Sequence, residues 1–122
     1  MRLNYAIVFV SDMQRSTAFY RDIVGLALKF ESPHWTEFAT GDATLALHPS
    51  DTPNAGGPSK EIAGWCRPGF AVRDFDAFHQ RMLDHGVTCV EQPRVVFGTK
   101  VAQYTDPDGL PFSIGEGGNW DK

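Results

Sequence analysis

Two stretches of this chain share one pattern, "YAIVFVSDMQRSTAFYRDIVG" at residues 5–25 and "RPGFAVRDFDAFHQRMLDHG" at residues 67–86. Each begins with a short apolar strand, reaches an Asp, continues with helical spacing of apolar residues and ends at a Gly. The two Asp residues, Asp12 and Asp74, lie about half of the 122-residue chain apart. The sequence therefore predicts two copies of one module, and no shorter period that would indicate a solenoid is present.

The helices are expected at about 12–24 and 74–85, because apolar residues recur there at i, i+3, i+4 and i+7. Ser11 or Asp12 can cap the first helix, and Gly25 and Gly86 can end the two helices. The short runs that follow predict strands at about 26–31, 35–40 and 43–48 in the first module, and at 87–91, 94–98, 100–105 and 110–115 in the second. The predicted order is β-α-β-β-β, twice.

This order predicts an α+β fold for residues 1–122, in a single domain whose modules span about 1–49 and 65–118. A Pro/Gly-rich loop at 49–64 joins them. One helix per module covers one sheet face, so we expect a cup-shaped, mostly antiparallel sheet with the helices on its outer face. Strand alternation assigns residues to the helix side (Ala6, Val8, Val10, Phe70, Val72, Phe112, Ile114) and to the cup (Tyr5, Ile7, Arg67, Gly69, Ser113).

Composition narrows the choice of partners and of cellular compartment. The net charge is −4 and no run of Lys or Arg occurs, which argues against nucleic acid and anionic membranes and favours neutral or cationic ligands. The two cysteines, Cys66 and Cys89, form neither a disulfide framework nor a metal-binding spacing. The apolar run at 6–10 is too short for a signal peptide or a membrane span. We therefore expect a cytoplasmic protein.

Three motifs carry a family resemblance: "VFVSDMQRSTAFYRDIVGL" at 8–26, "FAVRDFDAF" at 70–78 and "YTDPDG" at 104–109. On these motifs the chain resembles the vicinal-oxygen-chelate superfamily over essentially its whole length. This superfamily includes glyoxalases, extradiol dioxygenases, fosfomycin-resistance enzymes and bleomycin-resistance proteins. The resemblance implies the two-module cup and, commonly, a homodimer. In character the chain is most similar to the bleomycin-resistance branch, which works without a metal.

The family's metal-ligand positions hold unsuitable residues in this chain. Metal-dependent members place His or Gln, Glu, His and Glu in the cup. The matching positions here are Tyr5, Ala46 (or His48, if the strand slips by two), Arg67 and Ser113. A divalent metal needs converging His or carboxylate ligands, and a guanidinium would repel it. The resemblance therefore implies no metal and no cofactor, and it argues against a metal-dependent lyase or dioxygenase.

The expected function is the binding of a small organic molecule in an aromatic-lined cup. The candidate ligand-binding residues are Tyr5, Ile7, Trp35, Glu37, His48, Arg67, Gln103 and Ser113. The alternative is a lyase, isomerase or dioxygenase-type enzyme of the same superfamily with a non-standard or absent metal site, for which no catalytic residue can be assigned. A weaker alternative builds a metal site from His48 and Glu37.

Several candidates have more than one interpretation. Trp35 either stacks on a flat ligand or packs in the protein, and His48 is either a hydrogen-bonding wall residue or a general base. Arg67 either pairs with an acidic residue such as Glu37, anchors an anionic group of the ligand, or turns into solvent.

The other singled-out residues are expected to be structural. His79 and His85 are assigned to solvent-facing or capping positions of the second helix, and His34 to an exposed turn. Asp106 and Asp108 look like a catalytic or metal pair, but turn chemistry explains both. Trp65 is expected to pack beside the linking loop, and Trp120 either is disordered or covers a partner subunit.

Overall fold

The computed structural model describes residues 4–50 and 66–117. Trp65, Trp120 and nearly all of the linking loop lie outside the described residues. The chain divides into two units, Met1–Gly56 and Gly57–Lys122. Within the described part of the chain, no helix has the length and apolar character needed to cross a bilayer.

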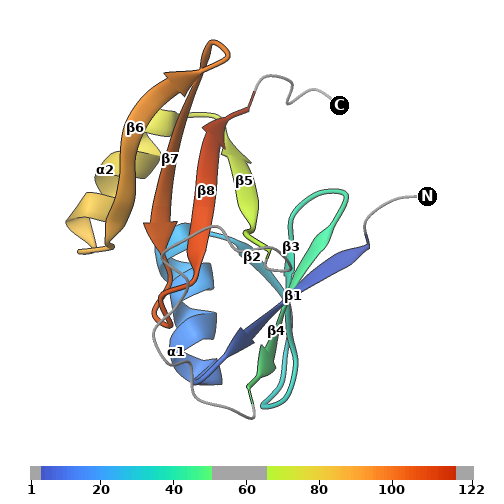
Figure 1. Cartoon of the computed structure of the whole chain (residues 1–122). Coiled ribbons are helices and arrows are strands. Elements are labelled where there is room, and N and C mark those ends of the chain that lie inside the picture. The colour runs from blue at the N-terminus through green and yellow to red at the C-terminus, as the bar shows by residue number, and fades with distance from the viewer. Residues whose placement is uncertain (1–3, 51–65, 118–122) are drawn as a thin grey trace. The chain divides into compact units, whose positions relative to one another are not determined.

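The first unit contains one four-stranded sheet in the order β1-β4-β3-β2 (Figure 1). Strand β1 runs parallel to β4, and the remaining pairs are antiparallel. Helix α1 continues directly into a π-helical segment, η1, and α1 contacts β4. The elements are β1 (Tyr5–Val10), α1 (Met13–Ala18), η1 (Phe19–Val24), β2 (Ala27–Glu31), β3 (Thr36–Ala39) and β4 (Thr44–Pro49).

The second unit repeats this arrangement with the sheet order β5-β8-β7-β6 (Figure 1). Strand β5 is parallel to β8, and helix α2 contacts β8. The elements are β5 (Gly69–Val72), α2 (Phe75–Asp84), β6 (Cys89–Val96), β7 (Thr99–Thr105) and β8 (Pro111–Glu116). The α+β class and the β-α-β-β-β order of both modules are confirmed, and each module builds its own sheet.

Strand β6 corrects one detail of the sequence prediction. Residues 87–91 and 94–98 were expected to form separate strands, whereas the structure has one strand, Cys89–Val96, with register shifts between Cys89 and Glu91 and between Glu91 and Arg94. Pro93 is tolerated inside it because β6 lies at the sheet edge, where a missing N–H breaks no ladder on the outer side.

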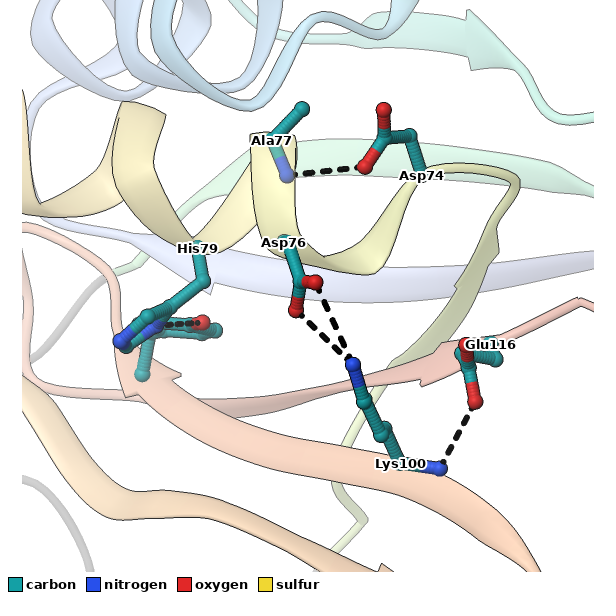
Figure 2. A network of polar contacts seen from close by, with 7 residues as sticks. Asp74, Asp76, Ala77, His79, Lys100 and Glu116 are labelled. Carbon is teal, nitrogen blue, oxygen red and sulfur yellow. Dashed lines mark hydrogen bonds and ion pairs between the residues drawn. The ribbon is translucent and has the colours of Figure 1, made fainter.

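The two Asp residues of the repeat cap the helices. The Asp12 carboxylate accepts a hydrogen bond from the backbone N–H of Arg15 at 3.0 Å, and the Asp74 carboxylate accepts one from Ala77 at 3.0 Å (Figure 2). Gly25 ends the first helical stretch with φ of 94°, a left-handed conformation that glycine adopts without steric cost. Asp12, rather than Ser11, is therefore the first cap.

The strand register agrees with the predicted alternation. Val8 and Val10 are 6% and 1% exposed, whereas Tyr5 and Ile7 are 48% and 39% exposed. In the second unit Phe112 and Ile114 are buried and Ser113 between them is half-buried. A slip of one residue would have inverted both patterns, so the assignment of faces in these two strands is confirmed.

Side-chain contacts join α2 to its sheet and strand β7 to strand β8 (Figure 2). Asp76 on α2 lies 3.1 Å from the Lys100 ammonium, and the Glu116 carboxylate accepts the backbone N–H of Lys100 at 3.1 Å. The ring nitrogen Nδ1 of His79 lies 2.7 Å from the hydroxyl of fully buried Tyr104. The solvent-facing or capping assignment of His79 was therefore wrong, because this half-buried ring joins helix to sheet, while His85 caps the helix as expected.

The "DPDG" turn is structural. Asp106 is 5% exposed, and its Oδ1 accepts the backbone N–H groups of Asp108 and Leu110, each at 2.9 Å. Gly109 has φ of 83°, which a β-branched or bulky residue would adopt only with strain. The prediction that turn chemistry explains Asp106 is confirmed.

Candidate ligand-binding face

The first sheet has one face covered by α1 and another that no helix of this unit covers, which we call the aromatic face: Tyr5, Ile7 and Phe9 of β1, Ala46 and His48 of β4, and Trp35 and Glu37 at β3. Tyr5, Ile7 and Phe9 alternate along β1 and are 48%, 39% and 62% exposed. The parallel register places Ile7 beside Ala46 and Phe9 beside His48. Large apolar side chains are thus concentrated on the side of the sheet that no helix of this unit covers.

Trp35 connects the two ends of the aromatic face. Its ring centroid lies 6.1 Å from that of Tyr5 and 6.3 Å from that of His48, both in edge-to-face geometry. The His48 ring in turn lies 5.5 Å from Phe9. Separations and angles of this kind are the favourable ones for aromatic pairs, so the four rings support one another.

Glu37 holds the indole in place. Its Oε2 accepts a hydrogen bond from Trp35 Nε1 at 2.7 Å, which is short for an N–H donor to a charged oxygen and indicates a strong bond. The other oxygen, Oε1, lies 3.7 Å from the Lys29 ammonium, and the Glu37 side chain is 28% exposed. Arg67, its expected partner, belongs to the other unit, so that pairing stays a prediction.

The His48 tautomer follows from its hydrogen bond. Nδ1 lies 2.7 Å from the backbone oxygen of Pro49. A carbonyl oxygen only accepts, so Nδ1 carries the hydrogen and the neutral ring has its lone pair on Nε2. His48 therefore donates through Nδ1 and presents an acceptor at Nε2.

Sequence reasoning missed two parts of this face. Phe9 shares the parity of Tyr5 and Ile7 along β1, so alternation alone identifies it. Lys29 reaches Glu37 through a register shift between Leu28 and Phe30 in β2. No sequence signal marks that bulge.

The second unit carries the remaining candidates. The register sets Ser113 of β8 beside Gly69 on one side and Gln103 of β7 on the other, so Ser113 and Gln103 are neighbours on one sheet face. Both are half-buried. Arg67 is exposed and precedes β5 by two residues, so it lies outside the strand in which the sequence placed it.

Comparison with known proteins assigns the family. The sequence profile of the Glyoxalase/Bleomycin resistance protein/Dioxygenase superfamily matches residues 2–114. The chain belongs to this superfamily. It is 29% identical over 119 residues to the metallothiol transferase FosB of Staphylococcus saprophyticus, covering 94% of this chain and 76% of FosB.

Two solved structures share the fold. A protein of unknown function from Agrobacterium tumefaciens is 28% identical, with a TM-score of 0.78 over 96% of this chain and 94% of its own. TnmS3, an antibiotic binding protein from a Streptomyces species, is 22% identical, with a TM-score of 0.74 over 97% of both chains. At that identity the likeness to TnmS3 concerns the fold alone.

The metal positions of the superfamily do not fit a metal in this chain. At the second position Ala46 offers no donor atom, and the alternative, His48, offers a single ring nitrogen. The Arg67 guanidinium carries a positive charge that a cation would avoid. Tyr5 and Ser113 supply only hydroxyl groups. Across residues 4–50 and 66–117, no group of three or more His, Cys, Asp or Glu side chains is placed to hold a metal ion.

Other reactive side chains, and a surface depression, lie outside the aromatic face. Burial raises the pKa of the Cys89 thiol, which donates to the backbone oxygen of Glu91 at 3.2 Å, and burial also raises the pKa of Tyr104. Both groups are therefore held protonated and are poor nucleophiles or acids at neutral pH.

A depression of about 500 Å³ lies between the start of α1, at Asp12 and Met13, and residues 31–33. The aromatic rings described above do not line it.

Proposed function

We propose that this protein binds a small, planar organic molecule on the aromatic face, without the metal used by other members of its superfamily. The observation that carries the proposal is the ring cluster of Tyr5, Phe9, Trp35 and His48 on the sheet face that no helix of its unit covers. Ligand sites are typically apolar and aromatic surfaces with a few fixed polar groups, and Glu37 and His48 supply such groups.

The second unit carries candidate ligand-binding groups of its own. Gln103 and Ser113 lie side by side on its sheet and supply hydrogen-bonding groups. Arg67, exposed ahead of β5, is proposed to pair with an acidic side chain or to contact an anionic group of the ligand. Ile7, on the aromatic face, adds apolar contact area.

Antibiotic sequestration is one form of this function. The fold is shared with an antibiotic binding protein, TnmS3, and binding alone suffices to withdraw a toxic molecule. A site built from aromatic rings and few polar groups suits such binding better than it suits a metal-assisted group transfer.

The competing function is an enzyme activity of the superfamily. The similarity to a metallothiol transferase, FosB, favours it, and His48 Nε2 is a possible base for a metal-free lyase or isomerase. The unsuitable residues at the metal positions count against the metal-dependent version of this activity.

The test is a thermal-stability screen of the purified protein, treated with a chelator, against planar aromatic compounds and antibiotics, bleomycin included. We expect at least one compound to raise the unfolding midpoint with the chelator present, because a ligand at 100 times its Kd stabilises by about 2.7 kcal/mol. Stabilisation that requires an added divalent metal would instead support the enzyme reading.

We further propose a cytoplasmic homodimer. The edge strands expose Leu28 and Phe30 on β2 and Val90 and Val95 on β6, and exposed apolar edges favour association. A mass near the 13.5 kDa of one chain in light scattering at micromolar concentration would contradict the dimer.

A further inference from the structure

Some polar atoms of the aromatic face already make hydrogen bonds within the protein, and others remain available to a ligand. The Trp35 N–H is already donated to Glu37, and the Nδ1–H of His48 is already directed at the oxygen of Pro49. What these groups leave is two acceptors, Glu37 Oε1 and His48 Nε2. Tyr5 adds an exposed hydroxyl that both donates and accepts. A ligand that brings donors is therefore matched at Glu37 and at His48.

Lys29 is the cation that faces Glu37 Oε1, and it is a weak competitor. Its ammonium lies 3.7 Å away, beyond hydrogen-bond distance, and its side chain is 54% exposed. Exposed ion pairs contribute about 0–1 kcal/mol, so a flexible lysine gives up this position at little cost. The bond from Trp35, at 2.7 Å, stays in place when Lys29 leaves.

The rings add a preference for positive charge. The faces of Tyr, Trp and Phe rings carry partial negative charge and attract a cation placed over them. The Trp35 ring lies beside the Glu37 carboxylate and is in edge-to-face contact with Tyr5, so a cationic aromatic molecule gains from both the carboxylate and these rings. The net charge of −4 acts in the same direction at longer range.

We infer that the ligand is a planar aromatic molecule bearing a protonated nitrogen, which replaces Lys29 at Glu37 Oε1 while its ring system packs against Trp35 and Tyr5. This inference rests on the proposed function and narrows its ligand class. In it Glu37 has two roles, since one oxygen positions the indole and the other selects the charge.

The test uses three probes with the same fused-ring shape: 9-aminoacridine, acridine and anthracene-9-carboxylate, which are cationic, neutral and anionic slightly above neutral pH. Equilibrium dialysis measures each Kd for the full chain and two variants. Glu37→Gln keeps an oxygen for the Trp35 N–H but removes the charge. Glu31→Gln is the matched control, because Glu31 pairs with buried Thr36 and so lies on the other side of the sheet.

We expect 9-aminoacridine to bind the unaltered protein at least about tenfold more tightly than the other two probes, the scale of a hydrogen bond to a charged group. Glu37→Gln should reduce this preference to about twofold, and Glu31→Gln should retain it. Equal binding of the three probes, or equal effects of the two variants, would overturn the inference and leave the proposed function standing. Failure of all three probes to bind would also overturn the inference, and the thermal-stability screen would then decide the proposed function.

Discussion

Replacement of Phe38 by alanine is expected to lower the free energy of unfolding by about 3–5 kcal/mol, the usual cost of removing a buried phenylalanine side chain. Phe38 lies at the centre of β3, is fully buried and has its ring centroid 6.1 Å from that of Tyr20. Its loss leaves a cavity between the sheet and the helical segment that cannot close without moving both. Urea unfolding followed by circular dichroism measures the change.

Phe30→Ala is the matched control for this substitution. Phe30 lies on the neighbouring strand β2 and is 52% exposed, so its loss should cost less than about 1 kcal/mol. Similar losses for the two variants would contradict the assignment of the buried and uncovered faces of this sheet.

The second large effect concerns the "DPDG" turn. Asp106→Ala should destabilise the protein by roughly 2–3 kcal/mol, because the backbone N–H groups of Asp108 and Leu110 lose their acceptor in a partly buried turn. The same unfolding measurement applies.

Asp106→Asn separates the turn from any chemistry at this position. The amide keeps one oxygen for both N–H groups, so we expect a loss below about 1 kcal/mol. If Asn proves as destabilising as Ala, the negative charge rather than the hydrogen bonds holds the turn, and the structural account of Asp106 is wrong.

Local patterns in the sequence predicted much of each unit. Alternation along "YAIVFV" separated Val8 and Val10 from Tyr5 and Ile7, because successive side chains of a strand point to opposite faces of the sheet. The Asp and Gly residues marked the helix ends because caps and left-handed positions restrict residue type. These signals act within a few residues, where a single sequence is most informative.

Features that depend on packing were not predictable in this way. The turn of helix at Phe19–Val24 is π-helical although its apolar spacing suits an α-helix, and the bulge that brings Lys29 to Glu37 has no sequence marker. The hydrogen bonds between Trp35 and Glu37 and between His79 and Tyr104 could not be predicted from the sequence. Neighbours along a strand, such as Trp35 and Glu37, share a face by alternation, but whether their polar atoms meet is decided by rotamers.

The most direct test of the aromatic face is an NMR titration of the ¹⁵N-labelled protein with 9-aminoacridine. Our account predicts the largest shifts for the indole N–H of Trp35 and for the backbone amides of Tyr5, Ile7 and His48, because a ring packed there changes their magnetic environment. Unchanged Trp35 and Tyr5 resonances, with shifts at Met13 and Thr17 around the depression beside α1, would contradict it.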